Sequence, residues 1–357
     1  MLIYALLFLF LCSFIYIENI KIDKTRTLSL GVKSTLSLVI ATCLIVISAV
    51  RWHTGQDFAT YLAIYNYIPS ILSGDDIFRG YGNIEPGFKL LTAVAKAFDS
   101  HVVYFALCAA LSLIPLCLGL KKFNKYHQIT LSYGILIYFC FFYINYNFNA
   151  MRQAITMGFF IYSIPYIYEN KSLKVFFISI FSALFHSTGL IILIGYIGSR
   201  FFLINSYKKF SLVILLSFIA YKIDILTRIF MMVGVNVTRW QDLWGGVSLS
   251  SIILRLIIIG VLIFPKPIFK QGRLAALLFT LYMFGFFIYM ALGSVDMMAA
   301  RFNMFFRVLE VLLIPLLIAS YNFKINKYFQ FLFLLTIYVL VLYVTASTEI
   351  NNYKFYF

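Results

Sequence analysis

Polar side chains gather in residues 51–88, between two long apolar segments. Those able to bind a phosphate, move a proton or contact a sugar are Arg51, His53, Gln56, Asp57, Tyr61 and Glu85. A guanidinium group binds phosphate oxygens through paired hydrogen bonds, and a carboxylate or an imidazole accepts a proton from a hydroxyl. We therefore interpret this stretch as part of an active site, although an ordinary hydrated loop would have a similar composition.

Arginines elsewhere in the chain are expected near this stretch, at or just inside the same boundary of a membrane. Together with Arg51 of the stretch itself, they form a set of five arginines: Arg51, Arg152, Arg239, Arg301 and Arg307. Cations are costly at membrane depth, so five arginines at this boundary need a functional reason. Guanidinium groups bind phosphate oxygens, and we therefore expect the set to clamp a diphosphate group. The alternative for any one arginine is a side chain that reaches lipid headgroups. Glu310 stands three residues after Arg307, so both project from one helical face, toward the protein.

Candidate proton acceptors are a histidine and two carboxylates. His186 falls in a polar turn and either accepts a proton or binds phosphate; the alternative is a hydrogen-bonded packing residue. Asp57 and Glu85 could accept a proton or position an acceptor sugar, and each could equally pair with a neighbouring arginine. Tyr61 could stack on a sugar ring, although aromatic belts at membrane surfaces account for most tyrosines of such a chain.

The composition is that of a membrane protein. Hydrophobic residues make up 62% of the chain and charged residues 12%, with a mean hydropathy of +0.93. These values exclude a soluble globular protein and indicate an all-α polytopic membrane protein. The net charge of +16 is attributed to sorting of Lys and Arg across the membrane, so no nucleic-acid partner is expected. The cysteines lack metal-ligand spacing and no nucleotide-binding glycine pattern occurs, so we expect neither a metal nor a cofactor.

Apolar runs long enough to cross the roughly 30 Å hydrocarbon core of a bilayer predict most of the spans. They cover about residues 2–17, 34–50, 101–120, 129–147, 152–168, 210–223, 250–264, 274–292, 303–320 and 328–346. The first run lacks a positive leading segment and a small-residue cleavage site, so we expect a retained span rather than a signal peptide. Another apolar region, 172–199, is either one long span or a hairpin of two short spans that meet at His186.

The distribution of positive charge decides between these alternatives. With the N-terminus outside and 172–199 as a hairpin, the inside loops hold 17 of the 29 Lys and Arg residues and three acids. A single span would break this positive-inside alternation beyond residue 199. We therefore predict about twelve transmembrane helices (range 10–12) in a single integral domain, residues 1–357, with both termini outside.

This topology places a long loop, residues 51–100, and the turns around Arg152 and His186 on the outer face. Pro86 suits the first turn of a helix. The apolar stripe after it predicts a short amphipathic helix along the membrane surface, and its residues are Phe88, Leu90, Leu91, Val94 and Phe98. Residues 224–249, which include Trp240 and Trp244, are expected to form another interfacial segment.

Five short patterns occur in order along the chain. They are Arg51-Trp-His-Thr-Gly55-Gln-Asp57-Phe-Ala-Thr-Tyr61, Glu85-Pro-Gly87-Phe, Met151-Arg152-Gln153-Ala154, Leu184-Phe185-His186-Ser187 and Arg301-Phe-Asn303. The first resembles the R-x-x-x-G-x-D-x-x-x-Y stretch after the second span of the EpsG family, and the others resemble that family's later landmarks. The family comprises membrane proteins of bacterial exopolysaccharide and O-antigen gene clusters and includes Wzy-type polymerases. Here the longest outer loop comes early, unlike the late loop of the other large Wzy group and the related ligases.

The resemblance implies a polymerase with an architecture similar to GT-C glycosyltransferases. Such an enzyme joins undecaprenyl-diphosphate-linked oligosaccharide repeat units into O-antigen or exopolysaccharide at the periplasmic face of the bacterial inner membrane. A chain-length regulator is an expected protein partner. We assign catalysis to His186, Asp57 and Glu85. Binding of the diphosphate and sugar is assigned to Arg51, Arg152, Gln153, Arg239, Arg301, Arg307 and Tyr61.

Two other functional classes remain as alternatives. A flippase or transporter of lipid-linked oligosaccharide would spread charged residues through the membrane midplane and show an internal repeat. A membrane acyltransferase acting on polysaccharide would place a reactive histidine toward a cytoplasmic acyl donor. Ionisable residues instead crowd the expected outer end, where His53 and His186 also fall, which favours the polymerase.

Overall fold

The chain is helical throughout the part that the structure, a computed structural model, describes. That part comprises residues 1–19, 28–79, 84–234, 245–264, 266–319 and 324–356. Within these ranges there is no strand, and the pairing of Arg51 with Phe355 is the sole β-bridge. The prediction of an all-α protein is therefore confirmed.

Two compact units divide the chain: Met1–Ile194 with Asn322–Phe357, and Gly195–Tyr321. The single integral membrane domain over residues 1–357 stays a prediction. The first unit contains α1 (Leu2–Asn19), α2 (Leu30–Ala49), α3 (Phe58–Tyr67), α4 (Pro86–Lys96), α5 (His101–Phe123), α6 (Leu131–Tyr138), η1 (Phe139–Asn149), α7 (Met151–Tyr168), α8 (Ser172–Ala183), η2 (Ser187–Leu190), α17 (Lys324–Ala346) and η4 (Glu349–Asn351). The second contains α10 (Tyr207–Ile223), α11 (Ile225–Met232), α13 (Leu249–Ile263), η3 (Ile268–Lys270), α14 (Arg273–Ala291), α15 (Asp296–Arg307) and α16 (Glu310–Ala319). Between them, α9 (Ile191–Phe201) begins in the first unit and ends in the second.

Helices lie at each of the predicted spans, and several are long and apolar enough to cross a membrane. Among the described residues there are five such helices, or up to seven if α10 with α11 and α15 with α16 each form one bent span. The chain is thus a polytopic membrane protein. The total of about twelve spans and the GT-C-like architecture stay predictions.

The predicted span 303–320 is bent instead of continuous, and a second bend follows directly after the predicted span 210–223. The bend between α10 and α11 is 52°, and it falls at Asp224, whose φ is +49°. A left-handed residue ends a helix, so the second helix starts in a new direction. α15 and α16 meet at 44°, around the two residues that separate Arg307 from Glu310.

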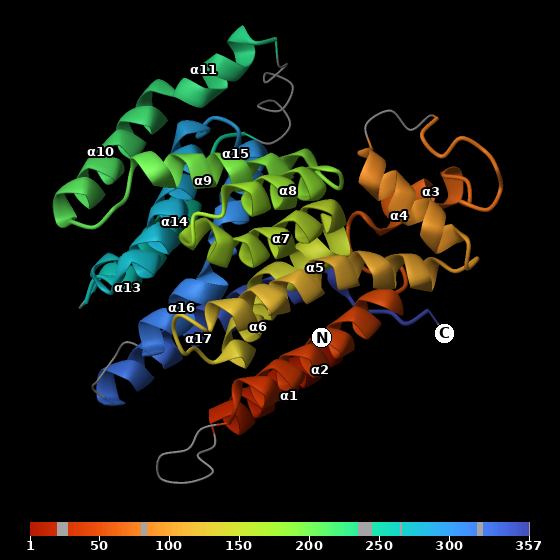
Figure 1. Cartoon of the computed structure of the whole chain (residues 1–357), viewed down its shortest axis with the longest axis horizontal. Helices are drawn as coiled ribbons and strands as arrows, with labels where there is room; N and C mark the ends of the chain where they lie inside the picture. Colours follow the sequence, from red (N-terminus) through yellow and green to blue (C-terminus); the bar gives the residue numbers. More distant parts are fainter. Residues whose placement is uncertain (20–27, 80–83, 235–244, 265, 320–323, 357) are drawn as a thin grey trace. The chain divides into compact units, whose positions relative to one another are not determined.

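The centre of the first unit is the close packing of α5 against α7, which lie side by side in Figure 1. A Cβ added to Gly158 of α7 would lie 2.1 Å from the carbonyl oxygen of Ser112 in α5. Small residues at such crossings let helix backbones approach closely, as is common in membrane proteins. This contact fixes the start of α7, where Arg152 lies.

The segment before α7 departs from the α-helix expected over 129–147. α6 continues into an 11-residue π-helix, η1, which runs to Asn149. Its Asn147 accepts a hydrogen bond from Tyr138 (2.7 Å) and donates one to Ser112 (2.5 Å). π-helical segments shift the direction of side chains and are frequent at functional sites.

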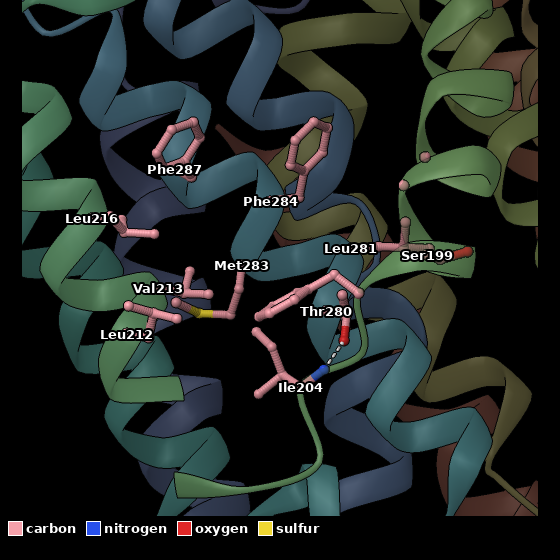
Figure 2. Close-up of a pocket in the computed structure, with 13 residues that line it drawn as sticks. Ser199, Ile204, Leu212, Val213, Leu216, Thr280, Leu281, Met283, Phe284 and Phe287 are labelled. Carbon is pink, nitrogen blue, oxygen red and sulfur yellow. Dashed lines mark hydrogen bonds between the residues drawn. The ribbon is translucent and has the colours of Figure 1, made fainter. Parts of the chain in front are cut away.

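Within the second unit, α9, α10 and α14 enclose an apolar pocket of about 320 Å³ (Figure 2). Leu212, Val213 and Leu216 line it from α10, and Leu281, Phe284 and Phe287 line it from α14. The Oγ1 atom of Thr280 accepts a hydrogen bond from the backbone N–H of Ile204 over 2.8 Å, which ties the loop after α9 to α14.

Candidate active site

Three segments of the first unit converge on the carboxylate of Glu85. Arg152, at the start of α7, donates from Nη1 to Glu85 Oε2 over 2.6 Å. The backbone N–H of Ser187, at the start of η2, donates to Oε1 over 3.1 Å. The predicted outer turns of α4, α7 and the α8–η2 connection therefore meet at one point, as expected for an active site assembled from separate loops.

The sequence around Glu85 leaves its carboxylate available for these partners. α4 begins at Pro86, which confirms the predicted helix start, and Glu85 is its N-cap residue with no capping bond from its side chain. Gly87 then donates its N–H to the carbonyl of Leu184 over 2.8 Å. A Cβ at Gly87 would lie 2.7 Å from Leu184 Cβ, so glycine permits this close docking of α4 on the end of α8.

The buried side of α4 differs from the predicted apolar stripe. Phe88 and Ala93 are buried, and α4 packs on α5. Leu90 and Phe98, which were grouped with Phe88 in the predicted stripe, are exposed. α4 thus has one apolar side against the protein, while Leu90 of the helix and Phe98 just beyond its end lie on the surface.

The helix α3 lies within the stretch predicted as a loop. Its Phe58, Tyr61, Ile64 and Tyr65 are buried in a shared apolar cluster with Phe88 of α4. The Nζ of Lys96 donates to the carbonyls of Asn66 (2.7 Å) and Ile68 (2.8 Å), at the end of α3. A cation at the C-terminal end of a helix satisfies its last carbonyls, and here it joins α3 to α4.

The guanidinium group of Arg152 is shared between Glu85 and Tyr61. A side-chain hydrogen bond joins Arg152 to the Tyr61 hydroxyl, and the guanidinium carbon lies 6.0 Å from the centre of the Phe88 ring. Burial raises the pKa of Tyr61, so its hydroxyl stays neutral. The side chains of Arg152 and Glu85 are 25% and 20% exposed, so the ion pair is reachable from the surface.

The imidazole of His186 is held in one tautomer by the backbone. Its Nδ1 accepts the N–H of Thr188 over 3.2 Å and lies 2.9 Å from Thr188 Oγ1, which is 3.3 Å from Thr156 Oγ1 on α7. A backbone N–H can only donate, so Nδ1 carries no proton and the proton of the neutral ring is on Nε2. His186 therefore presents a hydrogen-bond donor, which suits phosphate binding better than the proton acceptance also predicted for it.

Gln153 lies one residue beyond Arg152 and is only 6% exposed. Its Oε1 has no hydrogen-bond partner within the described part of the chain. A buried amide oxygen without a partner is unusual and commonly marks a place that a ligand or water completes.

Arg51 is placed deep inside the first unit, with an exposed fraction of 0%. Its guanidinium donates to the carbonyls of Ser48 (2.7 Å) and Phe148 (3.4 Å) and lies 4.3 Å from the centre of the Phe105 ring. Its Nε is buried and has no hydrogen-bond partner within the described part of the chain. The structure thus shows that Arg51 ties α2 to η1 and α5, and its binding of a diphosphate stays a prediction.

The loop after Arg51 is held by the segment 348–356. Trp52 donates its N–H to the carbonyl of Lys354, Gly55 donates to Ile350, and Tyr356 donates to Val50, each over 2.9 Å. Gly55 has φ +100°, and a Cβ there would lie 2.8 Å from Asn149 Oδ1.

The side chains that follow this loop are differently placed. His53, with φ +44°, is exposed and its ring lies 4.8 Å from that of Trp52. The half-buried Asp57 is the N-cap residue of α3 and donates its own N–H to Asn149 Oδ1 over 3.4 Å.

The remaining predicted arginines belong to the second unit or lie outside the residues that the structure describes. Arg301 is exposed on α15. Arg307 is 2% exposed and its Nε donates to Glu310 Oε1 over 2.7 Å, so the predicted inward-facing pair is confirmed. Arg239, Trp240 and Trp244 lie outside the described residues.

Sequence reasoning missed several polar residues that the structure brings into these networks. Thr188 and Asn149 fix His186 and the Gly55 loop, and their types carry no signal that separates them from other polar turn residues. Arg255 is different, since it is a lone cation in the apolar run of α13 and bonds to Asn303. A charged residue inside a span predicts function by default, so this signal was present in the sequence.

Comparison with known proteins gives one match that covers nearly the whole chain. The sequence model described as the EpsG family matches residues 34–356. No curated protein and no solved structure matches the chain.

Proposed function

The chain belongs to the EpsG family, and from this premise we propose that it polymerises undecaprenyl-diphosphate-linked oligosaccharide repeat units at the periplasmic face of the bacterial inner membrane. The family is associated with polysaccharide polymerase or glycosyltransferase-like activity. The observation that carries the proposal is the Glu85–Arg152 ion pair, where three segments bearing family patterns meet at a partly exposed position.

The chemistry needed is displacement of a diphosphate by a sugar hydroxyl. The bond between the anomeric carbon of the growing chain and its phosphate oxygen breaks, and a bond from that carbon to the acceptor oxygen forms. The bonding electrons leave with the undecaprenyl diphosphate, which gains negative charge. Groups aimed at the developing charge lower the barrier most, and removing one such donor typically costs 10²–10³ in rate.

Arg152 is the proposed contact for the leaving diphosphate. Its planar fork matches two phosphate oxygens, and its charge persists at any physiological pH. His186 is proposed as a second donor through Nε2–H, because Nδ1 is engaged by Thr188. The unpartnered Oε1 of Gln153 is available to accept a hydrogen bond from a sugar hydroxyl.

Glu85 is the proposed acceptor of the hydroxyl proton. While it pairs with Arg152, its Oε2 is occupied by a hydrogen bond from the guanidinium group. A diphosphate that binds Arg152 competes with Glu85 for that group, and the released carboxylate oxygen is free to accept a proton. Substrate binding and base activation are then coupled through one ion pair, and the transferred proton ends on Glu85. Asp57, at the start of α3, is the proposed second carboxylate, positioning the acceptor sugar.

The test is deletion of the gene in its host, followed by separation of surface polysaccharide and lipid-linked intermediates on a gel. The expected result is loss of the polymer ladder and accumulation of single repeat units on the lipid carrier. Complementation with the unaltered gene serves as the control and should restore the ladder.

The flippase and the acyltransferase predict other products on the gel after deletion of the gene. Long chains of normal composition after deletion would overturn the polymerase proposal. Long chains with altered acyl content would favour the acyltransferase, and intermediates trapped on the inner leaflet would favour the flippase. A ladder that returns with Arg152→Ala would keep the polymerase and remove this arginine from the proposed mechanism.

A further inference from the structure

A second buried charged cluster lies in the Gly195–Tyr321 unit, where Arg255 lies near the ion pair of Arg307 and Glu310. Arg307 donates from Nε to Glu310 Oε1 over 2.7 Å and from Nη2 to Oε2 over 3.3 Å. The hydroxyl of Tyr282 donates to the same Oε1 over 2.9 Å. Glu310, which is 0% exposed, is therefore already engaged by two partners.

The second arginine of this cluster, Arg255, is held in place by neutral groups. Its Nε donates to Asn303 Oδ1 over 2.7 Å, and its Nη1 donates to the carbonyl of Ser251 over 2.9 Å. The guanidinium carbon lies 3.6 Å from the centre of the Tyr289 ring, as in a stacked cation–π contact. The side chain is 7% exposed. Within the described residues, Nη2 has no hydrogen-bond partner.

No carboxylate within the described residues hydrogen-bonds to Arg255. The carboxylate of Glu310 is bonded to Arg307, and Arg307 acts on Arg255 by repulsion. Asp296, half-buried in the first turn of α15, acts on the Tyr289 hydroxyl. A cation buried in a membrane protein without a matched anion is costly, and such residues mark sites that a charged ligand completes.

We propose that Arg255 binds a phosphate oxygen of an anionic ligand through its Nη2 edge, while Asn303 and Tyr289 hold the guanidinium plane. Stacking on one ring fixes that plane and leaves its edge for in-plane bonding, which is how arginine recognises phosphate. The ligand is either a lipid with a phosphate headgroup or a soluble phosphate. Binding requires neither a sugar nor transfer, so the site is independent of the proposed polymerase activity.

The first test uses the unaltered protein, purified whole and placed in phosphatidylcholine nanodiscs. An arginine-specific dicarbonyl reagent modifies exposed guanidinium edges, and mass spectrometry measures the rate at Arg255. Phosphatidic acid in the nanodisc probes the lipid source, and inorganic phosphate in the buffer probes the soluble source. We expect a roughly tenfold slower reaction at Arg255 with one of them, and an unchanged rate at the exposed Arg200 of the same unit.

A second test measures binding of the protective probe to variants. Arg255→Gln should weaken binding about tenfold to a hundredfold, the value of a hydrogen bond to a charged group. Arg255→Lys keeps the charge but loses the bond to Asn303, so its affinity should lie between those of the unaltered protein and Arg255→Gln. Arg200→Gln should bind the probe with unaltered affinity.

Protection by phosphatidic acid alone assigns a lipid headgroup, and protection by inorganic phosphate alone assigns a soluble ligand. Equal modification of Arg255 with and without both probes overturns the proposal. Because the first test needs no variant, that result overturns the proposal even where Arg255→Gln does not fold. Loss of polymer in cells tests the polymerase proposal instead, so the phosphate site and the polymerase activity can fail separately.

Discussion

The ion pair between Glu85 and Arg152 allows a structural role to be separated from a catalytic one. A double-mutant cycle with Glu85→Gln, Arg152→Gln and both changes measures the coupling of the two side chains. The joined atoms are 2.6 Å apart and the side chains are 20–25% exposed. Exposed pairs contribute about 0.2–1 kcal/mol and breaking a buried pair costs about 3–5 kcal/mol, so we expect a coupling of about 1–2 kcal/mol here.

Stability and activity should respond differently around this cycle. In stability, the double variant should recover part of what each single variant loses, because no charge is left without its partner. Polymer formation should not recover. Arg152→Gln removes a donor to the leaving diphosphate and is expected to lower polymer yield about 100-fold or more. Arg152→Lys, which retains the charge but not the fork, should retain part of the activity.

The assays are thermal unfolding of the detergent-purified protein and the polymer ladder of complemented cells, normalised to the amount of protein in the membrane. Wild-type ladders from Arg152→Gln would refute the proposed catalytic role. A double variant that regains both stability and polymer would show that the pair only holds α4 against α7.

Four further predictions concern individual contacts. Gly87→Ala should destabilise the protein by about 1–3 kcal/mol through the clash with Leu184, as for other overpacked sites. Gly198→Ala, at a position with open space around it, is the control and should be neutral in the same thermal assay. His186→Gln can keep a hydrogen-bond donor near the position of Nε2, whereas His186→Asn can keep only the acceptor for the Thr188 N–H. Polymer yield should therefore fall at least tenfold more with His186→Asn than with His186→Gln. The reverse order would favour a purely structural histidine. In a cysteine-free background, Gln56→Cys should react with an impermeant maleimide from outside and Lys125→Cys should not, since both positions are exposed. The opposite labelling would reverse the predicted orientation. Deletion of the residues from Ile350 onward should abolish the ladder while the protein still inserts, and an intact ladder would show that the Gly55 loop folds without that segment.

The sequence predicted well those features that depend on local patterns. Pro86 marked the start of α4, and the turns containing Arg152 and His186 were assigned to one membrane face before the structure brought both to Glu85. Apolar runs located the helices because lipid-facing and core-facing segments are both hydrophobic over long stretches. The spacing of Phe58, Tyr61 and Ile64 is also helical, so α3 could have been recognised.

Other features depend on contacts between distant segments and carry no local signal. Arg51 reads as an exposed cation, yet it is buried because rings from α3, α5 and η1 surround it. The π-helix has a sequence that resembles any apolar helix, and its Asn147 bonds to Ser112 of a distant segment. The tautomer of His186 depends on one backbone N–H, which no residue pattern specifies.

The pairing of the Gly55 loop with residues 348–356 sets the order in which the protein can mature. Thr54 Oγ1 accepts the N–H of Lys354 across a separation of 300 residues. A ribosome therefore releases the loop long before its partner exists, and all the intervening helices must enter the bilayer first. The loop that leads into α3 closes only after this late segment arrives. A chain stalled before Lys354 can thus be inserted and helical and still lack the closed loop.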